Sequence, residues 1–66
     1  MRITLKVYTL LGQSVATLVR ADQAPGRYAV SWDGTDDRGR PLGAGIYFYR
    51  MVAGPFTKSE KLVIER

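Results

Sequence analysis

Residues 30–51, VSWDGTDDRGRPLGAGIYFYRM, carry the strongest structural signal in the chain. An apolar run ends at Trp32, a connection rich in Gly and Asp follows, and a second run extends from Ile46 to Met51. Gly, Pro and Asp allow the chain to reverse at little steric cost, and large aromatic side chains fill the centre of a small domain. This stretch therefore predicts a strand, a long turn and a second strand.

Alternating apolar and polar residues predict the strands on either side. Residues 3–8 alternate in this way, and residues 14–19 resume the pattern after a break at Gly12, so the two segments should form a hairpin. A helix also fits the apolar spacing of residues 11–19, but Gly12 and the β-branched residues favour the strand. Further strands are expected at residues 27–32, 46–52 and 57–65, with a turn at residues 53–56. The run 46–52 is apolar on both faces apart from Arg50, which is typical of a central strand. The sequence thus indicates one small all-β domain over residues 1–66.

The large apolar side chains of these strands are the candidates for the core. Trp32 is expected to anchor it, and the three aromatic residues after Ile46 are interpreted as core rather than as a platform for stacking bases. The predicted core residues are Leu5, Val7, Tyr28, Val30, Trp32, Tyr47, Phe48 and Tyr49.

The composition excludes several classes of function. The 66 residues include no Cys and no His, which removes disulfides, thiolate and imidazole metal ligands, and the usual general base. The net charge of +4 suggests an acidic partner, but the ten Lys and Arg residues are scattered and accompany no nucleic-acid-binding motif, so we expect no nucleic acid. No apolar run approaches the ~18 residues of a membrane helix, and no signal peptide precedes the first strand, so no membrane insertion is expected.

Three Asp residues in the connection form the one acidic cluster of the sequence. Asp33, Asp36 and Asp37 suggest a calcium loop, but Arg38 stands where an EF-hand has its invariant Gly, and no Glu closes the loop. Asp in turns usually bonds to neighbouring backbone, and this structural interpretation is preferred. Catalytic carboxylates would need an enclosed pocket, the serines have no His partner, and the Gly-rich residues 43–45 lead into a strand rather than a helix. We predict no enzyme, no cofactor and no metal.

Several short motifs follow one another in the order of a known family. They are residues 7–15 (VYTLLGQSV), 26–28 (GRY), 32–34 (WDG), 37–39 (DRG) and 45–50 (GIYFYR). Together they resemble the Ig-like domain of the flagellar hook-capping protein and the C-terminal sorting domains of the type IX secretion system. Thr9 stands where Asp is common in these sequences. The motif positions are Gly12, Gly26, Asp33, Gly34, Gly39 and Gly45. The resemblance implies a small antiparallel Ig-like β-sandwich of about five strands.

The resemblance also implies a non-enzymatic module of a secreted or cell-surface bacterial protein. In the sorting branch, such a module ends its cargo and is read by the secretion machinery. The end of this chain is similar to the basic, apolar ending of those signals, through Lys61, Leu62, Val63, Ile64 and Arg66. In the hook-cap branch, the module would belong to a flagellar assembly scaffold. A self-assembling structural subunit is a third alternative.

Family members usually carry one more strand before the first hairpin, and this chain begins without it. We therefore expect residues 3–8 to form an edge strand that offers Ile3, Leu5 and Val7 for pairing with another chain. A chain of this length also buries little surface by itself, which favours association. The expected partners are the secretion or assembly machinery, or other copies that form homo-oligomers through strand edges.

Overall fold

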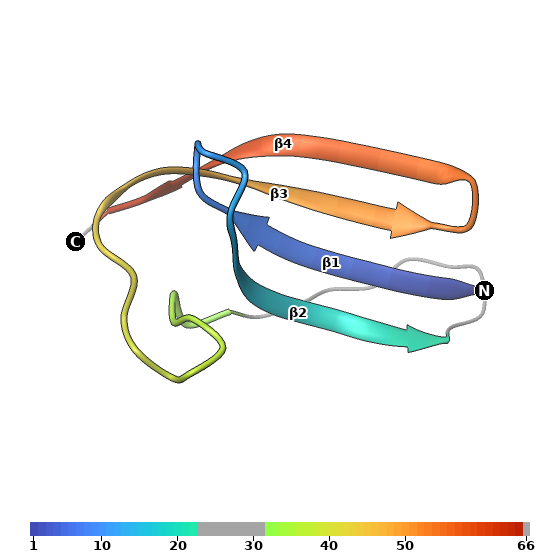
Figure 1. The fold of residues 1–66 in the computed structure, drawn as a ribbon, viewed down its shortest axis with the longest axis horizontal. Coiled ribbons are helices and arrows are strands. Elements are labelled where there is room, and N and C mark those ends of the chain that lie inside the picture. The colour runs from blue at the N-terminus through green and yellow to red at the C-terminus, as the bar shows by residue number, and fades with distance from the viewer. Residues whose placement is uncertain (23–31, 66) are drawn as a thin grey trace.

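The computed structural model describes residues 1–22 and 32–65, whose regular secondary structure consists of strands (Figure 1). The strands are β1 (Arg2–Tyr8), β2 (Ser14–Asp22), β3 (Gly45–Ala53) and β4 (Phe56–Ile64). They form one antiparallel sheet in the order β2-β1-β3-β4. The predicted all-β antiparallel class is confirmed, and the sheet is consistent with a small Ig-like β-sandwich fragment. No helix within the described residues is long and apolar enough to cross a membrane.

A short turn at residues 9–13 closes the hairpin of β1 and β2. The Thr9 amide donates to the Gln13 carbonyl, and the Gly12 amide donates to the Thr9 carbonyl, both at 2.9 Å. The Thr9 hydroxyl accepts from the Gln13 amide at 3.3 Å, which is a role that Asp also performs in turns. Gly12 has a φ of 84°, a conformation that residues with a Cβ rarely adopt. The predicted break at Gly12 and the hairpin around it are confirmed.

The pairing of β2 with β1 is interrupted twice. Register shifts after Leu5 and after Val7 leave Leu18 and Val15 of β2 without an opposite residue on β1. Such β-bulges bend a strand and increase its twist. The end of the sheet at which β1 finishes is therefore more strongly twisted than a regular ladder would be.

The connection between residues 32 and 44 docks beside this irregular part of β2 (Figure 1). The Asp37 amide donates to the Val15 carbonyl at 3.0 Å, and the Asp37 Oδ1 accepts from the Thr17 amide at 2.8 Å. These bonds occupy backbone groups on the outer edge of β2, where no strand pairs among the described residues.

A two-residue turn, Gly54-Pro55, joins β3 to β4. Ala53 lies opposite Phe56, and Gly54 has a φ of 60°. A positive φ at the first position is what a type II′ hairpin turn requires, and Pro suits the second. The turn predicted at residues 53–56 is confirmed.

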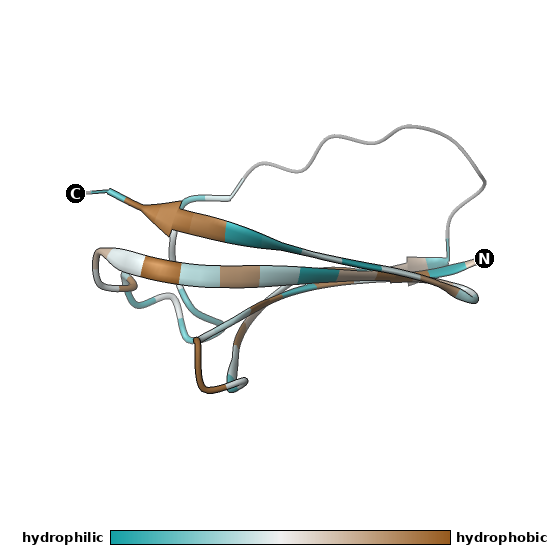
Figure 2. Cartoon of the chain, turned by 90° about the horizontal axis from the view of Figure 1, so that it is seen from above, coloured by the Kyte–Doolittle hydropathy of each residue, from teal (hydrophilic) through white to brown (hydrophobic). Residues whose placement is uncertain are grey.

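Side chains alternate between the two faces of the sheet along each strand, and directly opposite residues of paired strands lie on the same face. The core face contains the buried residues Val7, Ala16 and Ala53, together with Tyr49 opposite Val7. The other side, which we call the outer face, carries Lys6, Tyr8 and the residues opposite them. The alternation is visible along the strands in Figure 2, where β4 also becomes apolar toward its C-terminal end.

One sequence prediction about the topology is wrong. β1 is not an edge strand, because β2 pairs with one side of it and β3 with the other. Ile3, Leu5 and Val7 therefore belong to the interior of the sheet. The alternation of residues 3–8 shows that they form a strand, but it does not show which distant segment becomes their second neighbour. The prediction that residues 46–52 form a central strand is confirmed, since β3 lies between β1 and β4.

The predicted core residues are buried to different extents. Val7 is fully buried, whereas Leu5 and Trp32 are half-buried. The three half-buried aromatic residues of β3 alternate, so that Tyr47 and Tyr49 share the core face and Phe48 lies on the outer face, away from the buried cluster. Two further residues predicted for the core, Tyr28 and Val30, lie outside the described residues.

Candidate protein-binding face

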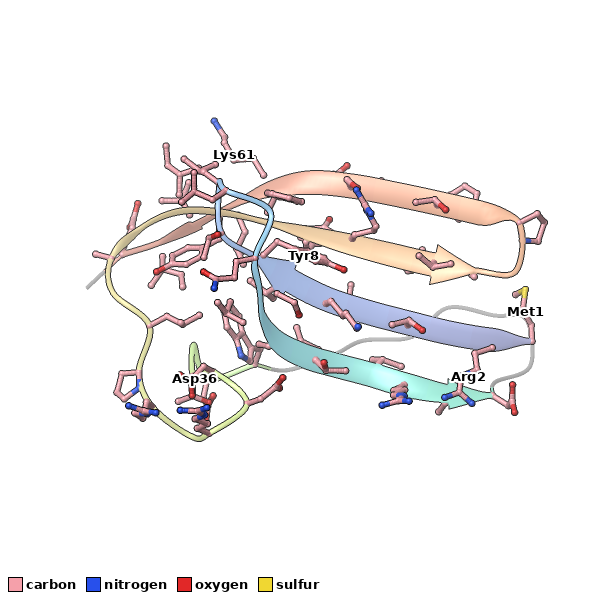
Figure 3. The ribbon with its side chains drawn as sticks, viewed as in Figure 1. Met1, Arg2, Tyr8, Asp36 and Lys61 are labelled. Atoms are coloured by element: carbon pink, nitrogen blue, oxygen red, sulfur yellow. The ribbon has the colours of Figure 1, made fainter. Side chains whose placement is uncertain are left out.

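The outer face brings together side chains from three strands. Tyr8, Phe48 and Lys61 lie opposite one another in a row across β1, β3 and β4, and Ile46 lies opposite Val63 beside this row. Figure 3 shows Tyr8 and Lys61 toward the same end of the sheet. Residues of the turn after β1 border the row. We call the resulting surface the outer patch, and it comprises Tyr8, Leu10, Ile46, Phe48, Arg50, Lys61 and Val63.

Two aromatic rings and a guanidinium form the centre of the outer patch. The rings of Tyr8 and Phe48 stack with their centroids 5.3 Å apart and their planes at 14°. The guanidinium carbon of Arg50 lies 5.7 Å from the Tyr8 ring centroid, within the range of a cation–π contact. Arg50 also donates through Nε to the Ser59 hydroxyl at 3.3 Å. This arrangement offers an apolar ring surface beside a positioned cation that can bind a carboxylate with two parallel hydrogen bonds.

Exposed apolar side chains surround this centre. The exposed fractions are 67% for Leu10, 48% for Ile46 and 51% for Val63. A shallow hollow beside the Phe48 ring is lined by apolar residues on one side and by residues of β4 on the other: Leu10, Ile46, Tyr47, Phe48, Ser59, Glu60 and Lys61. Single exposed apolar residues are common on any protein, but a group of them around an aromatic pair is typical of an interaction site.

The outer face is cationic. The strand register assigns six charged residues of the described strands to this face. Five of them are cations and one is a carboxylate. The carboxylate, Asp22, lies opposite Arg2 at the end of the sheet away from Tyr8 (Figure 3). The cations are Arg2, Lys6, Arg20, Arg50 and Lys61. The positive electrostatic potential of these residues attracts acidic surfaces and repels basic ones.

The core face has a polar margin on β4. The Tyr49 hydroxyl donates to Glu60 Oε2 at 2.8 Å, and Lys58 Nζ lies 3.3 Å from Glu60 Oε1. The bond from Tyr49, followed by the bond from Lys58, lowers the pKa of Glu60 below its ordinary value. The same bond raises the pKa of Tyr49. These two bonds therefore favour the carboxylate form of Glu60.

The three Asp residues of the connection bond to the backbone around them. Asp33 Oδ1 accepts from the amide and the hydroxyl of Thr35, at 3.1 and 2.6 Å. Asp36 Oδ1 accepts from the amides of Arg38 and Arg40, at 2.9 and 3.0 Å, and the bond from Arg40 is the main cause that lowers the pKa of Asp36. These contacts agree with the structural interpretation of the cluster. Within residues 1–22 and 32–65, no group of three or more acidic residues is placed to hold a metal ion.

The family-motif residues that the structure describes lie in turns or at the start of a strand. Gly39 donates to the Asp36 carbonyl at 2.9 Å and closes the predicted tip of the connection. The Trp32 indole donates to the Thr35 carbonyl at 2.9 Å, so Trp32 and Asp33 both stabilise the start of this loop. Gly26 lies outside the described residues. Positive φ angles occur at Gly12, Gly34, Gly39 and Gly45. These φ angles account for Gly at those four motif positions.

The segment similar to sorting signals is part of the sheet. Residues 61–64 lie in β4, opposite Phe48 to Gly45 of β3. Lys61 and Val63 belong to the outer face, and Leu62 and Ile64 to the core face. Arg66 lies outside the described residues.

Sequence reasoning did not identify Tyr8, Leu10 and Arg50 as members of a site. Each stands in a segment that indicates a strand, a turn or the family, but not a binding role. The pairing of β1 with β3 brings Tyr8 beside Phe48 and Arg50 from a distant part of the chain, and Leu10 follows in the turn after β1. No local pattern carries that information.

A comparison with protein-family models matches residues 2–55 to the FlgD Ig-like domain. This range includes β1, β2, β3 and the connection before β3. The searches of curated proteins and of solved structures returned no match. The matched range contains Tyr8, Phe48 and Arg50 and ends before β4.

Proposed function

The chain belongs to the FlgD Ig-like domain family, and from this membership we propose that it is a non-enzymatic attachment module in a bacterial cell-surface assembly. The hydrogen bonds made by the acidic side chains support the non-enzymatic part of the proposal, because these carboxylates already have partners within the fold. The Asp residues of the connection bind backbone amides, and Glu60 binds Tyr49 and Lys58. The chain would act as part of a larger exported protein.

The outer patch is the observation that carries this proposal. Its stacked rings and hollow fit an apolar or aromatic side chain of a partner. Arg50 and Lys61 fit carboxylates that surround such an anchor, since the face around them is cationic. The partner is therefore a protein surface with an apolar centre and an acidic rim.

Two settings fit an attachment module. In a hook-cap assembly, the partner is another subunit of the flagellar structure, and the family membership favours this setting. In sorting, the partner is the secretion machinery, and the basic, apolar residues 61–64 favour it. The secretion machinery would then bind β4 as a folded strand, through the side chains of Lys61 and Val63 on the outer face.

A random copolymer of glutamate and tyrosine tests the chemistry of the outer patch. In an NMR titration, we expect shifts at Tyr8, Phe48 and Arg50, and tighter binding than with polyglutamate or with single-stranded DNA. Arg50→Glu should weaken binding by about tenfold or more. Arg20→Glu makes the same charge change on the same face outside the patch and should have a much smaller effect. Equal losses in the two variants, or shifts confined to the core face, would contradict the proposal.

A reporter experiment separates the two settings. A signal peptide and a fluorescent reporter are fused ahead of this chain in a bacterium that has the type IX system. Reporter that reaches the cell surface, and that fails to do so with Arg50→Glu, supports sorting through the outer patch. Reporter that stays in the periplasm excludes sorting. Exchange of the chain into a hook-capping protein, followed by measurement of hook length and swimming, then tests the other setting.

A further inference from the structure

β4 is an open edge of the sheet. Among the described residues it pairs with β3 alone, whereas the outer edge of β2 is partly occupied by Asp37. An edge strand presents a row of backbone amides and carbonyls that can pair with another strand. β4 spans Phe56–Ile64, and Pro55, which lacks an amide hydrogen, lies just before it in the turn. The edge is thus long enough and regular enough to add a strand.

The sequence of β4 is complementary to itself around Ser59. If β4 lies antiparallel to β4 of a second copy with Ser59 opposite Ser59, then Lys58 lies opposite Glu60, and Phe56 lies opposite Leu62. Both pairs belong to the core face by register. Thr57 lies opposite Lys61 on the outer face. The opposed pairs therefore join opposite charges, apolar groups or polar groups, and none of these pairs places like charges opposite each other.

Neighbouring registers lack this complementarity. A shift by one residue would place the core face of one copy beside the outer face of the other, because side chains alternate along a strand. A shift by two in one direction places Lys58 opposite Lys58, and in the other direction Glu60 opposite Glu60. Like charges directly opposite each other destabilise a sheet.

We propose that β4 pairs with β4 of a second copy about a two-fold axis at Ser59, so that two four-stranded sheets become one. Charged residues on an edge usually discourage pairing, and here they discourage the two registers that are shifted by two residues. Lys58 and Glu60 are each about half exposed, and the exposed Phe56 gains Leu62 of the second copy as an apolar neighbour. The two-fold pairing closes on itself and forms a dimer rather than a filament. It also places both outer patches on the same side of the joined sheet. The dimer does not depend on the partner proposed above.

Cysteine cross-linking tests the register, because the chain contains no Cys of its own. Ser59→Cys should form a disulfide-linked dimer rapidly under mild oxidation, since opposite Cα atoms lie within disulfide reach. Thr57→Cys and Lys61→Cys should each cross-link slowly alone, because the two copies of either residue are about 13 Å apart along the strand. A mixture of the Thr57→Cys and Lys61→Cys variants should cross-link readily. Equal rates for the three variants alone would overturn the register.

Charge reversal tests the pairing without a covalent bond. The wild-type chain should show a dimer that dissociates on dilution in sedimentation velocity. Lys58→Glu and Glu60→Lys should each remain monomeric, because each places like charges opposite each other in a homodimer. Mixed together, the two variants should associate, because every opposed charge pair is then attractive. Circular dichroism of each variant checks that the strands are retained. A wild-type chain that is monomeric at all concentrations, or a mixture that does not associate, would overturn the proposal.

Discussion

Asp36 shows how one side chain organises a whole loop. Its Oδ1 accepts from the amides of Arg38 and Arg40, and its own amide donates to the Arg40 carbonyl at 2.8 Å. Asp36→Ala removes the side-chain acceptor, whereas Asp36→Asn keeps an oxygen in the same place. We therefore expect Asp36→Ala to lower the thermal midpoint more than Asp36→Asn, with faster amide exchange at Arg38 and Arg40. Identical midpoints and exchange rates in the two variants would contradict this role.

The same carboxylate makes stability depend on acid pH. The pKa of Asp36 is lowered from 3.8, mainly by the bond from the Arg40 amide, so the folded state binds this proton less readily than the unfolded state. Its contribution is complete above the unfolded value and is lost as the pH falls through the lower, folded value. Glu60, lowered from 4.5 mainly by Tyr49, behaves in the same way. Thermal midpoints measured from about pH 6 to about pH 2 should fall below about pH 4.5. Asp36→Asn should reduce that fall, and a midpoint that rises on acidification would argue against the assignment.

Trp32 stabilises the start of the loop that follows it. Its ring is half-buried, and its indole donates to the Thr35 carbonyl. Trp32→Ala should lower the free energy of unfolding by about 3 kcal/mol, at the low end of the range for large aromatic core residues. Trp32→Phe keeps a ring but no donor and should cost less. Urea denaturation measures both variants, and an unchanged midpoint for Trp32→Ala would refute the anchoring role predicted from the sequence.

The hairpin of β3 and β4 depends on a backbone conformation at Gly54. A side chain there would be strained by the φ of 60°, and its Cβ would lie 3.2 Å from the Met1 sulfur. Gly54→Ala should therefore cost about 1–2 kcal/mol of unfolding free energy. Gly43→Ala is the matched control, because no atom lies within 4 Å of the added Cβ and φ is not positive there. The control should be neutral or slightly stabilising. Equal losses of unfolding free energy in the two variants would show that the backbone conformation of the turn does not cause the destabilisation.

At the scale of elements, strands and turns could be predicted because their signals are local. The alternation of residues 3–8 and the break at Gly12 each lie within a few residues of the structure that they specify. The second neighbour of β1 could not be predicted, because β3 begins far along the chain and its own pattern fits several positions in a sheet. The bulges at Val15 and Leu18 could not be predicted from the sequence either, because they depend on how β2 pairs with β1 rather than on either strand alone.

At the scale of the whole molecule, the charge distribution changes the interpretation of the composition. The basic residues are scattered along the sequence, which gave no reason to expect a patch. The sheet gathers five of them on one face, because residues at alternate positions of neighbouring strands share a side. The outer patch therefore depends on the strand order, as does the open edge at β4. A different order would remove both.

Amide hydrogen exchange, resolved by residue, tests this strand order most directly. A strand with neighbours on both sides has every amide bonded, whereas an edge strand bonds every second one. In a dilute sample, consecutive amides of β1 and β3 should exchange slowly, and those of β4 should alternate between slow and fast. Alternating exchange along β1, with continuous protection along β4, would contradict the order β2-β1-β3-β4 and the proposals that rest on it.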